Sequence, residues 1–143
     1  MKTLHIFRSI LACLMIGLAL FSSCKKHDPD PEVDREKFLG TYDLTETCSG
    51  SPDTYEITVS AGADENEIEI KNFYSPGIDV KATISGNKVT IPSQNFTGQF
   101  EGEPITVTFT GSGTLSGDKL TIEYSVAIPD LGSDECTAVA IKQ

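Results

Sequence analysis

The sequence predicts an all-β domain over residues 36–143, built as an eight-stranded antiparallel up-and-down β-barrel. After residue 40 the apolar residues recur at every second position, and no segment has the spacing of an amphipathic helix. Short turn sequences separate the alternating segments, so neighbours in sequence can pair as hairpins. Closing such a meander into a barrel leaves no strand edge exposed.

Three segments show the alternation most clearly. In residues 55–59, Tyr, Ile and Val alternate with Glu and Thr. In residues 105–110, Ile, Val and Phe alternate with Thr. In residues 120–126, Leu, Ile, Tyr and Val alternate with Thr, Glu and Ser. Each pattern predicts a strand with one dry face and one wet face.

The remaining elements follow from turn signals along the chain. Residues 35–39 allow one short turn before the first strand, Gly86-Asn87 predicts a two-residue hairpin, and residues 116–118 predict a tight turn. The eight strands are expected at residues 41–48, 54–61, 67–73, 79–85, 88–94, 104–114, 119–126 and 135–142.

Two cysteines support the closed barrel independently. Cys48 lies at the end of the first expected strand and Cys136 at the start of the last. These strands pair antiparallel in an eight-stranded meander barrel, so a disulfide between the two cysteines would clamp the closure seam. Closing a loop of that length would stabilise the fold by about 4–5 kcal/mol on the chain-entropy argument. A metal pair is the alternative, but His27 is the only histidine outside the leader, so other soft ligands are lacking.

The side-chain alternation leaves one question about this seam. Cys48 falls on the face of the bulky Tyr42, whereas Cys136 falls on the face of Ala138 and Ala140 rather than on that of larger residues. Either a bulge shifts the last strand, or the alanines face the interior.

The start of the chain has the pattern of an export signal. Lys2 and Arg8 precede an apolar run of 12 residues at 10–21, which is too short to span a bilayer and suits a signal peptide. The stretch from Leu20 to Cys24 resembles the lipobox of bacterial lipoproteins. That resemblance implies cleavage before Cys24 and lipidation of this new N-terminal cysteine, for example with palmitate.

A flexible acidic tether is expected after the lipidated cysteine. Residues 25–34 hold prolines and charges without apolar periodicity. The tether resembles the surface-export signals of lipoproteins in Bacteroidota, although a plain solvated spacer would look the same. The expected organisation is a signal peptide at 1–23, a lipidated tether at 24–35 and a barrel at 36–143. We expect the protein on the outer membrane or cell surface of a Gram-negative bacterium, held to the membrane through the lipid on Cys24.

Composition restricts the classes of function. The chain has 21 acidic and 11 basic residues, and removal of Lys2 and Arg8 with the signal changes the net charge from −10 to −12. Such a field repels phosphate backbones, so nucleic-acid binding is not expected. It favours either a cationic partner or simply solubility at a crowded surface, and we expect a monomer. Residues 28–143 contain no histidine for nucleophilic catalysis, and no carboxylate pair stands out. We therefore expect a protein that is not an enzyme and has no cofactor or metal.

A family resemblance rests on residues 37–42, Lys-Phe-Leu-Gly-Thr-Tyr. This stretch resembles the start of a lipocalin-type barrel, where a short turn precedes Gly-x-Trp on the first strand; here Tyr42 replaces the tryptophan. Lipocalins also place a basic residue of the last strand against that aromatic ring, and Lys142 is in position to do so. Across residues 36–143 the chain is similar to small lipocalin-like lipoproteins of Bacteroidota, of the calycin type. The resemblance implies a cup-shaped barrel and a small apolar ligand.

The expected loop lengths place a candidate site at one end of the barrel. The longer connections are expected near residues 49–53, 74–78, 95–103 and 127–134, all at the end that carries the cysteine pair. Binding residues favour loops on a rigid scaffold, and aromatic residues favour recognition sites. Tyr74, Phe96 and Phe100 are therefore candidate ligand contacts. Alternatively, Phe73 and Phe96 plug the barrel mouth as part of the core.

Glu46 is the fourth candidate contact, because it shares the inward parity of the first strand. A buried carboxylate needs a partner. We favour a place at the wet mouth, near the strand end; a bond to an interior group such as Tyr124 and contact with a ligand are the alternatives. The leading functional hypothesis is binding of a small apolar or amphipathic ligand at the barrel mouth. The alternative is a surface protein-interaction or inhibitor module with no small-molecule ligand, directed at a cationic protein.

Overall fold

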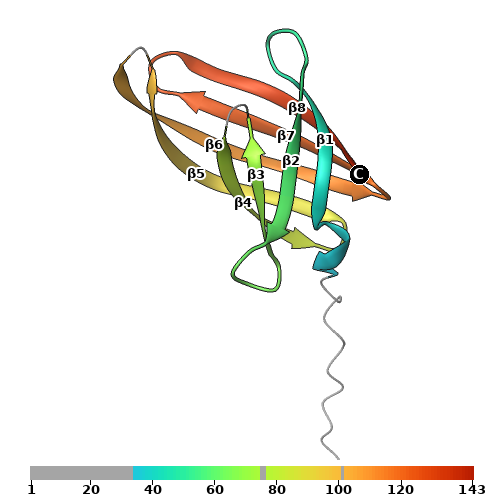
Figure 1. Ribbon diagram of the computed structural model, residues 1–143. Coiled ribbons are helices and arrows are strands. Elements are labelled where there is room, and N and C mark those ends of the chain that lie inside the picture. Colours follow the sequence, from blue (N-terminus) through green and yellow to red (C-terminus); the bar gives the residue numbers. More distant parts are fainter. Residues whose placement is uncertain (1–33, 75–76, 101) are drawn as a thin grey trace, which may run out of the picture. The chain divides into compact units, whose positions relative to one another are not determined.

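The computed structural model describes residues 34–74, 77–100 and 102–143. Within them, eight strands follow one another in a closed barrel in which every strand pairs antiparallel with its neighbours in sequence, and β1 pairs with β8 (Figure 1). The predicted all-β up-and-down barrel is confirmed. The expected signal peptide, Cys24 and the tether through residue 33 lie outside the described residues.

The elements agree closely with the expected order. A short 3-10 helix, η1, precedes the strands where a single turn was predicted. The bounds are η1 Arg35–Lys37, β1 Gly40–Thr47, β2 Asp53–Ala61, β3 Glu67–Phe73, β4 Ile78–Ser85, β5 Lys88–Phe100, β6 Glu103–Ser116, β7 Lys119–Ile128 and β8 Gly132–Lys142.

The disulfide clamps the closure seam, as predicted. Cys48 and Cys136 are bonded, with their Cα atoms 4.1 Å apart. The β1–β8 ladder runs in one unbroken register, from Tyr42 opposite Lys142 to the pair next to the disulfide, so no bulge intervenes. Ala138 and Ala140 face the interior instead, with at most 1% of their surface exposed. The inward alanines thus resolve the question of parity.

Strand alternation and one capping turn build the core. All eight strands contribute inward side chains to the core, and among the described residues the buried side chains lie between Phe38 and Ala140. Burial of this alternating apolar face is the main driving force for a barrel of this size. Core and pairings both lie within residues 34–143, so this segment has what it needs to fold alone.

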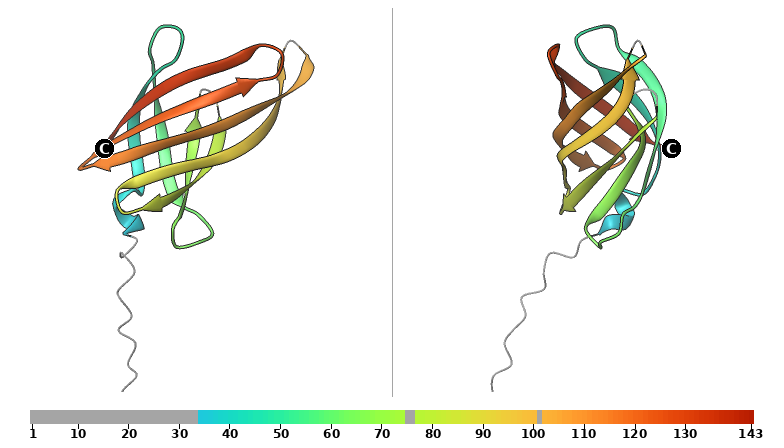
Figure 2. Two further views of the ribbon diagram at one scale, coloured as in Figure 1. Left: turned by 180° about the vertical axis from the view of Figure 1, so that it is seen from behind. Right: turned by 90° about the vertical axis from the view of Figure 1, so that its left-hand side faces the viewer.

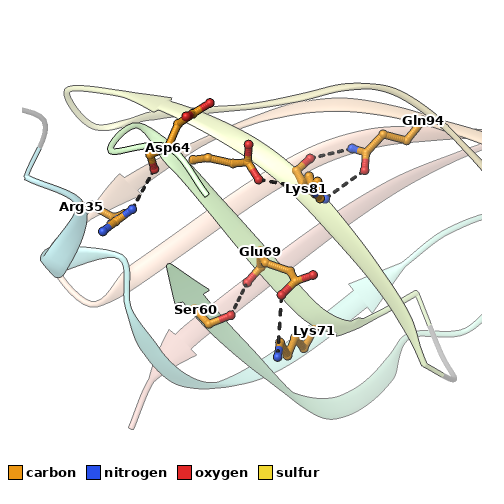
Figure 3. Close-up of polar contacts among 8 residues, drawn as sticks. Arg35, Ser60, Asp64, Glu69, Lys71, Lys81 and Gln94 are labelled. Carbon is orange, nitrogen blue, oxygen red and sulfur yellow. Dashed lines mark hydrogen bonds and ion pairs between the residues drawn. The ribbon is translucent and has the colours of Figure 1, made fainter. Parts of the chain in front are cut away.

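The η1 turn closes one end of the barrel. Phe38, just after η1, is fully buried, and its carbonyl accepts a hydrogen bond of 2.8 Å from the Tyr42 hydroxyl. Arg35 donates to the backbone carbonyl of Asp64 at 2.8 Å (Figure 3). Lys37 donates to the Asn87 side chain at 2.7 Å. These bonds fasten the turn to two connections at the same end.

The predicted contact between the last strand and the first-strand aromatic is present. Lys142 Nζ lies 6.0 Å from the centroid of the Tyr42 ring and donates to the Lys37 carbonyl at 3.2 Å. Gly40 permits this approach, because a Cβ there would meet Lys142 Cε at 2.8 Å and its φ is +142°.

The opposite end differs from the prediction. Two of the four connections expected to be long are mostly strand: β5 continues to Phe100, β6 begins at Glu103, β7 continues to Ile128 and β8 begins at Gly132. The polar, glycine-containing run after residue 94 looks like a loop, but pairing with β6 makes it a strand. Figures 1 and 2 show the two resulting hairpins reaching out together at the same end. The connections after β1 and β3 remain loops, as expected.

The barrel separates between β4 and β5. Their pairing covers only the three pairs from Thr83↔Thr90 to Ser85↔Lys88. Further along, the Gln94 side chain spans the gap: it donates to the Lys81 carbonyl at 2.6 Å and accepts from the Lys81 amide at 2.9 Å (Figure 3). A register shift between Ile91 and Gln94 marks the same place on the β6 side. From here β5 diverges from β4 while staying paired with β6 (Figure 2).

Candidate ligand groove at the open end

An apolar groove lies where β5 separates from β4. Its volume is about 630 Å³, and we call it the rim groove. Phe96, Ile105, Val107 and Ile128 form its apolar wall on the inner face of the extended β5–β7 strands. Tyr74 and other residues around the start of β4 form the opposite side. The wall residues are only half-buried, because β1–β4 end before they could cover this part of the sheet.

Two residues of the rim groove, Tyr74 and Phe96, pack on a buried cluster of aromatic rings. Phe109 is fully buried; Tyr74 and Phe96 meet it edge-on, with centroids at 5.2 and 5.3 Å. Phe73 is fully buried too, with its ring centroid 4.8 Å from that of Tyr124. Edge-to-face contacts of this kind stabilise aromatic clusters beyond simple burial. Phe73 is therefore core, whereas Phe96 touches the core and also lines the groove.

Glu46 lies beneath this cluster rather than at a wet mouth. It is 6% exposed, and its Oε1 accepts hydrogen bonds from the hydroxyls of Tyr124 and, at 2.8 Å, Tyr55. The expectation of a solvated carboxylate is wrong, and the bond to Tyr124 is the alternative that the structure shows. The reason is geometric: Tyr124 and Glu46 both point inward, and their strands are separated only by β8.

This carboxylate holds a groove residue in place through one intermediary. The Tyr55 hydroxyl accepts a hydrogen bond of 3.0 Å from the Tyr74 amide. Tyr74 has a φ of +53°, which is uncommon for a residue other than glycine, so the bond helps to hold an unfavourable backbone conformation. Glu46 thus positions Tyr74 instead of lining the groove.

Burial and charge keep the phenols of the cluster protonated. Burial raises the pKa of Tyr124 well above its ordinary value, and the hydrogen bond and charge of Glu46 raise it further. Burial also raises the pKa of Tyr74, with smaller contributions from the charges of Asp134 and Glu46. The two tyrosines therefore act as neutral hydrogen-bonding groups at neutral pH.

Only some of the candidate residues predicted from the sequence line the groove. Tyr74 and Phe96 line the rim groove. The backbone of Phe100 ends β5, opposite Glu103, but its side chain lies outside the described part of the chain. Cys24, the predicted lipidation site, also lies outside the described residues.

Sequence reasoning missed six apolar groove residues: Ile78, Ile105, Val107, Val126, Ile128 and Leu131. The strict alternation from residue 105 onward marks an apolar face, but it does not reveal that the face is left uncovered. Leu131 is 69% exposed at the β7–β8 turn, and an exposed leucine in a turn was the one available signal.

The open end is strongly acidic. None of its four connections, residues 48–52, 74–77, 101–102 and 129–131, contains Lys or Arg. Acidic residues stand at or beside the strand ends there: Asp53, Asp79, Glu103, Asp130, Asp134 and Glu135. Among them Asp79 lines the rim groove itself. The groove therefore combines an apolar wall with a negative rim.

Among the described residues, no group of three or more His, Cys, Asp or Glu side chains is arranged to hold a metal ion. In that same part of the chain, no helix has the length and hydropathy needed to cross a membrane.

Fold and site together define a small, closed antiparallel barrel with an apolar groove beside its open end. No protein-family model matches the chain, and no curated protein or solved structure shows significant similarity to it.

Proposed function

We propose that this chain is a lipid-anchored lipoprotein of the cell envelope whose barrel binds a small apolar or amphipathic ligand in the rim groove. The observation that carries the proposal is the groove itself, about 630 Å³ in volume. Pockets for small ligands are commonly ~300–1,000 Å³, mostly apolar and equipped with a few polar groups. Phe96, Ile105 and Val107 supply the apolar wall, and Tyr74 and Asp79 the polar side.

The distribution of polarity favours an amphipathic ligand. Its apolar part would lie against the β5–β7 wall, where the half-buried side chains gain further burial. Its polar part would lie at the acidic rim, in contact with water. Tyr74 and Phe96 are held by ring contacts with the buried Phe109, so a ligand meets a largely preformed site.

The attachment to the membrane rests on the leader and its lipobox-like end at Cys24. Expression of the full chain with an alkyne analogue of palmitate should label the wild type and leave Cys24→Ala unlabelled. Label on Cys24→Ala, or none on the wild type, would remove lipidation from the proposal and leave ligand binding unaffected.

Ligand binding can be tested with residues 34–143 and the neutral dye N-phenyl-1-naphthylamine. Gly98 lies on the groove wall, has no positive φ, and a Cβ there would meet nothing within 4 Å. Gly98→Leu should therefore fill the groove without straining the fold. We expect saturable dye fluorescence with the wild type and an affinity lower by about tenfold, or ~1.4 kcal/mol, with Gly98→Leu.

The matched control adds the same side chain to the outer face. Thr106 is exposed and does not line the groove, so Thr106→Leu should change the dye affinity less than about twofold. Equal loss with both variants, or no saturable binding by the wild type, contradicts the groove as the binding site. If the wild type binds the dye and Gly98→Leu weakens that binding, native mass spectrometry after exposure to cell extracts would identify the natural ligand.

The acidic open end favours a second candidate, a surface module that binds or inhibits a cationic protein without any small ligand. Such binding would weaken steeply with salt, because it depends on exposed charges. Absence of dye binding together with salt-sensitive capture of a cationic protein would select this second function.

A further inference from the structure

We propose that the free edge of β5 beside the rim groove accepts an extended peptide segment of alternating basic and apolar residues, as an added strand. The inference goes beyond small-ligand binding. It uses the same groove but does not depend on a small molecule occupying it.

The first observation is an unpaired strand edge within a closed barrel. β5 pairs with β6 as far as Phe100, yet on its other side the pairing with β4 stops at Thr90. Beyond the Gln94 bridge, residues 95–99 have no strand partner on the β4 side among the described residues. A row of unpaired backbone groups is a template for strand addition.

The edge also lacks the usual protection. Natural sheets block exposed edges with lysine, proline or a bulge. Here Pro92 and the register shift lie before the gap, next to the Gln94 bridge. Residues 95–99, Asn-Phe-Thr-Gly-Gln, contain neither lysine nor proline, so every residue retains its amide hydrogen.

The faces of β5 define which side chains an added strand should carry. Phe96 pairs with the half-buried Val107 and Gly98 with the half-buried Ile105, so these two β5 positions lie on the inner face, although Thr97 and Gln99 also border the groove. Thr97, between them, is exposed, and its hydroxyl contacts that of Thr106 at 3.1 Å on the outer face. Side chains of an added strand alternate in the same way. Every second one would enter the groove, where Gly98 leaves open space, and should be apolar.

Charge complementarity selects the remaining side chains. Asp79 lies across the gap on β4 and Glu103 at the exposed start of β6, and the four connections at this end contain no basic residue. A segment bearing lysine or arginine at its outward positions would be attracted by this acidic end of the barrel, whereas an acidic segment would be repelled. The occupant is therefore a basic–apolar peptide.

The test uses residues 34–143 and a fluorescein-labelled peptide of alternating lysine and valine. Three control peptides separate the contributions of charge, alternation and backbone hydrogen bonds. The first has glutamate in place of lysine, and the second has the lysines and valines in separate blocks. The third is the alternating peptide N-methylated at every second amide, prepared in either register. We expect binding only by the unmodified alternating lysine–valine peptide, and a loss of at least about tenfold for N-methylation in one register. Amide exchange within residues 95–99 should slow on binding.

Neutralising acidic residues of the protein tests the contribution of charge. Asp79→Asn with Glu103→Gln should weaken the peptide by about fivefold or more. Glu103 does not line the groove, so Glu103→Gln alone should leave neutral-dye binding nearly unchanged. Binding that ignores N-methylation in both registers, protection confined to residues outside 95–99, or no peptide binding overturns the proposal. Protection of 95–99 by self-association, seen as concentration-dependent sedimentation without peptide, also overturns it.

The outcomes separate this inference from the proposed function. Dye binding without peptide binding retains the small-ligand function and rejects strand addition. Peptide binding by a protein that binds no dye supports strand addition and rejects the small-ligand function. If both bind, the peptide should displace the dye, because its apolar side chains would occupy the groove.

Discussion

Tyr124 on β7 donates its phenolic hydrogen to Glu46 on β1, 78 residues away in sequence, inside the barrel. The same carboxylate oxygen accepts from Tyr55, which in turn holds the Tyr74 amide. One buried carboxylate therefore connects three strands to the side of the rim groove. A hydrogen-bond network of this kind is stabilising because each buried member has a partner.

This network predicts a specific alkaline behaviour. Burial and Glu46 raise the pKa of Tyr124 in the folded state, while in the unfolded chain the phenol ionises near its ordinary value of 10.0. Above about pH 10 the unfolded state has lost a proton that the folded state keeps, so stability should fall with rising pH by about 1.4 kcal/mol per unit for this group. Below that pH the contribution is fully present.

Tyr124→Phe removes this dependence as well as the hydrogen bond. Near pH 8, loss of the bond should cost about 1–3 kcal/mol in urea unfolding. Above about pH 10 the difference between variant and wild type should shrink, because the variant has no phenol to ionise. Parallel stability curves for the two proteins across this range would contradict the raised pKa.

The disulfide should contribute most of its effect at the closure seam. Replacing Cys48 and Cys136 with Ser and Ala opens a loop of 88 residues and should lower the free energy of unfolding by about 4 kcal/mol. Hydrogen exchange should rise first along β1 and β8, which the bond joins. A reductant should reproduce the change in the wild type and do nothing to the double variant; a uniform rise in exchange across all strands would contradict a local seam.

Two inward glycines on β6 should be intolerant of any side chain. A Cβ at Gly111 would lie 2.6 Å from Tyr124 Cβ and 2.7 Å from the Glu123 carbonyl oxygen, and one at Gly113 would lie 2.5 Å from the Thr121 carbonyl oxygen. Because backbone atoms cannot move aside cheaply, Gly111→Ala and Gly113→Ala should each cost about 2 kcal/mol or more. Gly98→Ala, with open space around it, is the control and should stay within about 0.5 kcal/mol of wild type.

Gln94 should control the separation of β4 and β5. Its amide both donates to and accepts from the Lys81 backbone, which a carboxylate cannot do. Gln94→Glu should therefore cost about 1 kcal/mol and speed exchange of the Lys81 amide, with little effect on the Ile84 amide, which bonds to Asn66. Unchanged exchange at Lys81 would show that the gap is held by other contacts.

Much of the fold could be predicted from the sequence, because the alternation of apolar and polar residues within a segment shows which face of that strand is buried. This alternation predicts the number and order of the strands, and closure of the barrel then brings Cys48 and Cys136 together. The partner of Glu46 could not be chosen, since Tyr124 was one of several inward groups and the geometry of the interior was unknown.

The amino-acid sequence alone determined an eight-stranded antiparallel barrel and the disulfide between Cys48 and Cys136. Tertiary structure decided how far each strand extends, where β5 separates from β4, and which apolar residues remain uncovered. The physical reason is that alternation at Ile105 or Val107 marks an inward face, while its coverage depends on the lengths of strands elsewhere in the chain. The rim groove therefore arises from unequal strand lengths, a non-local property that no single segment encodes.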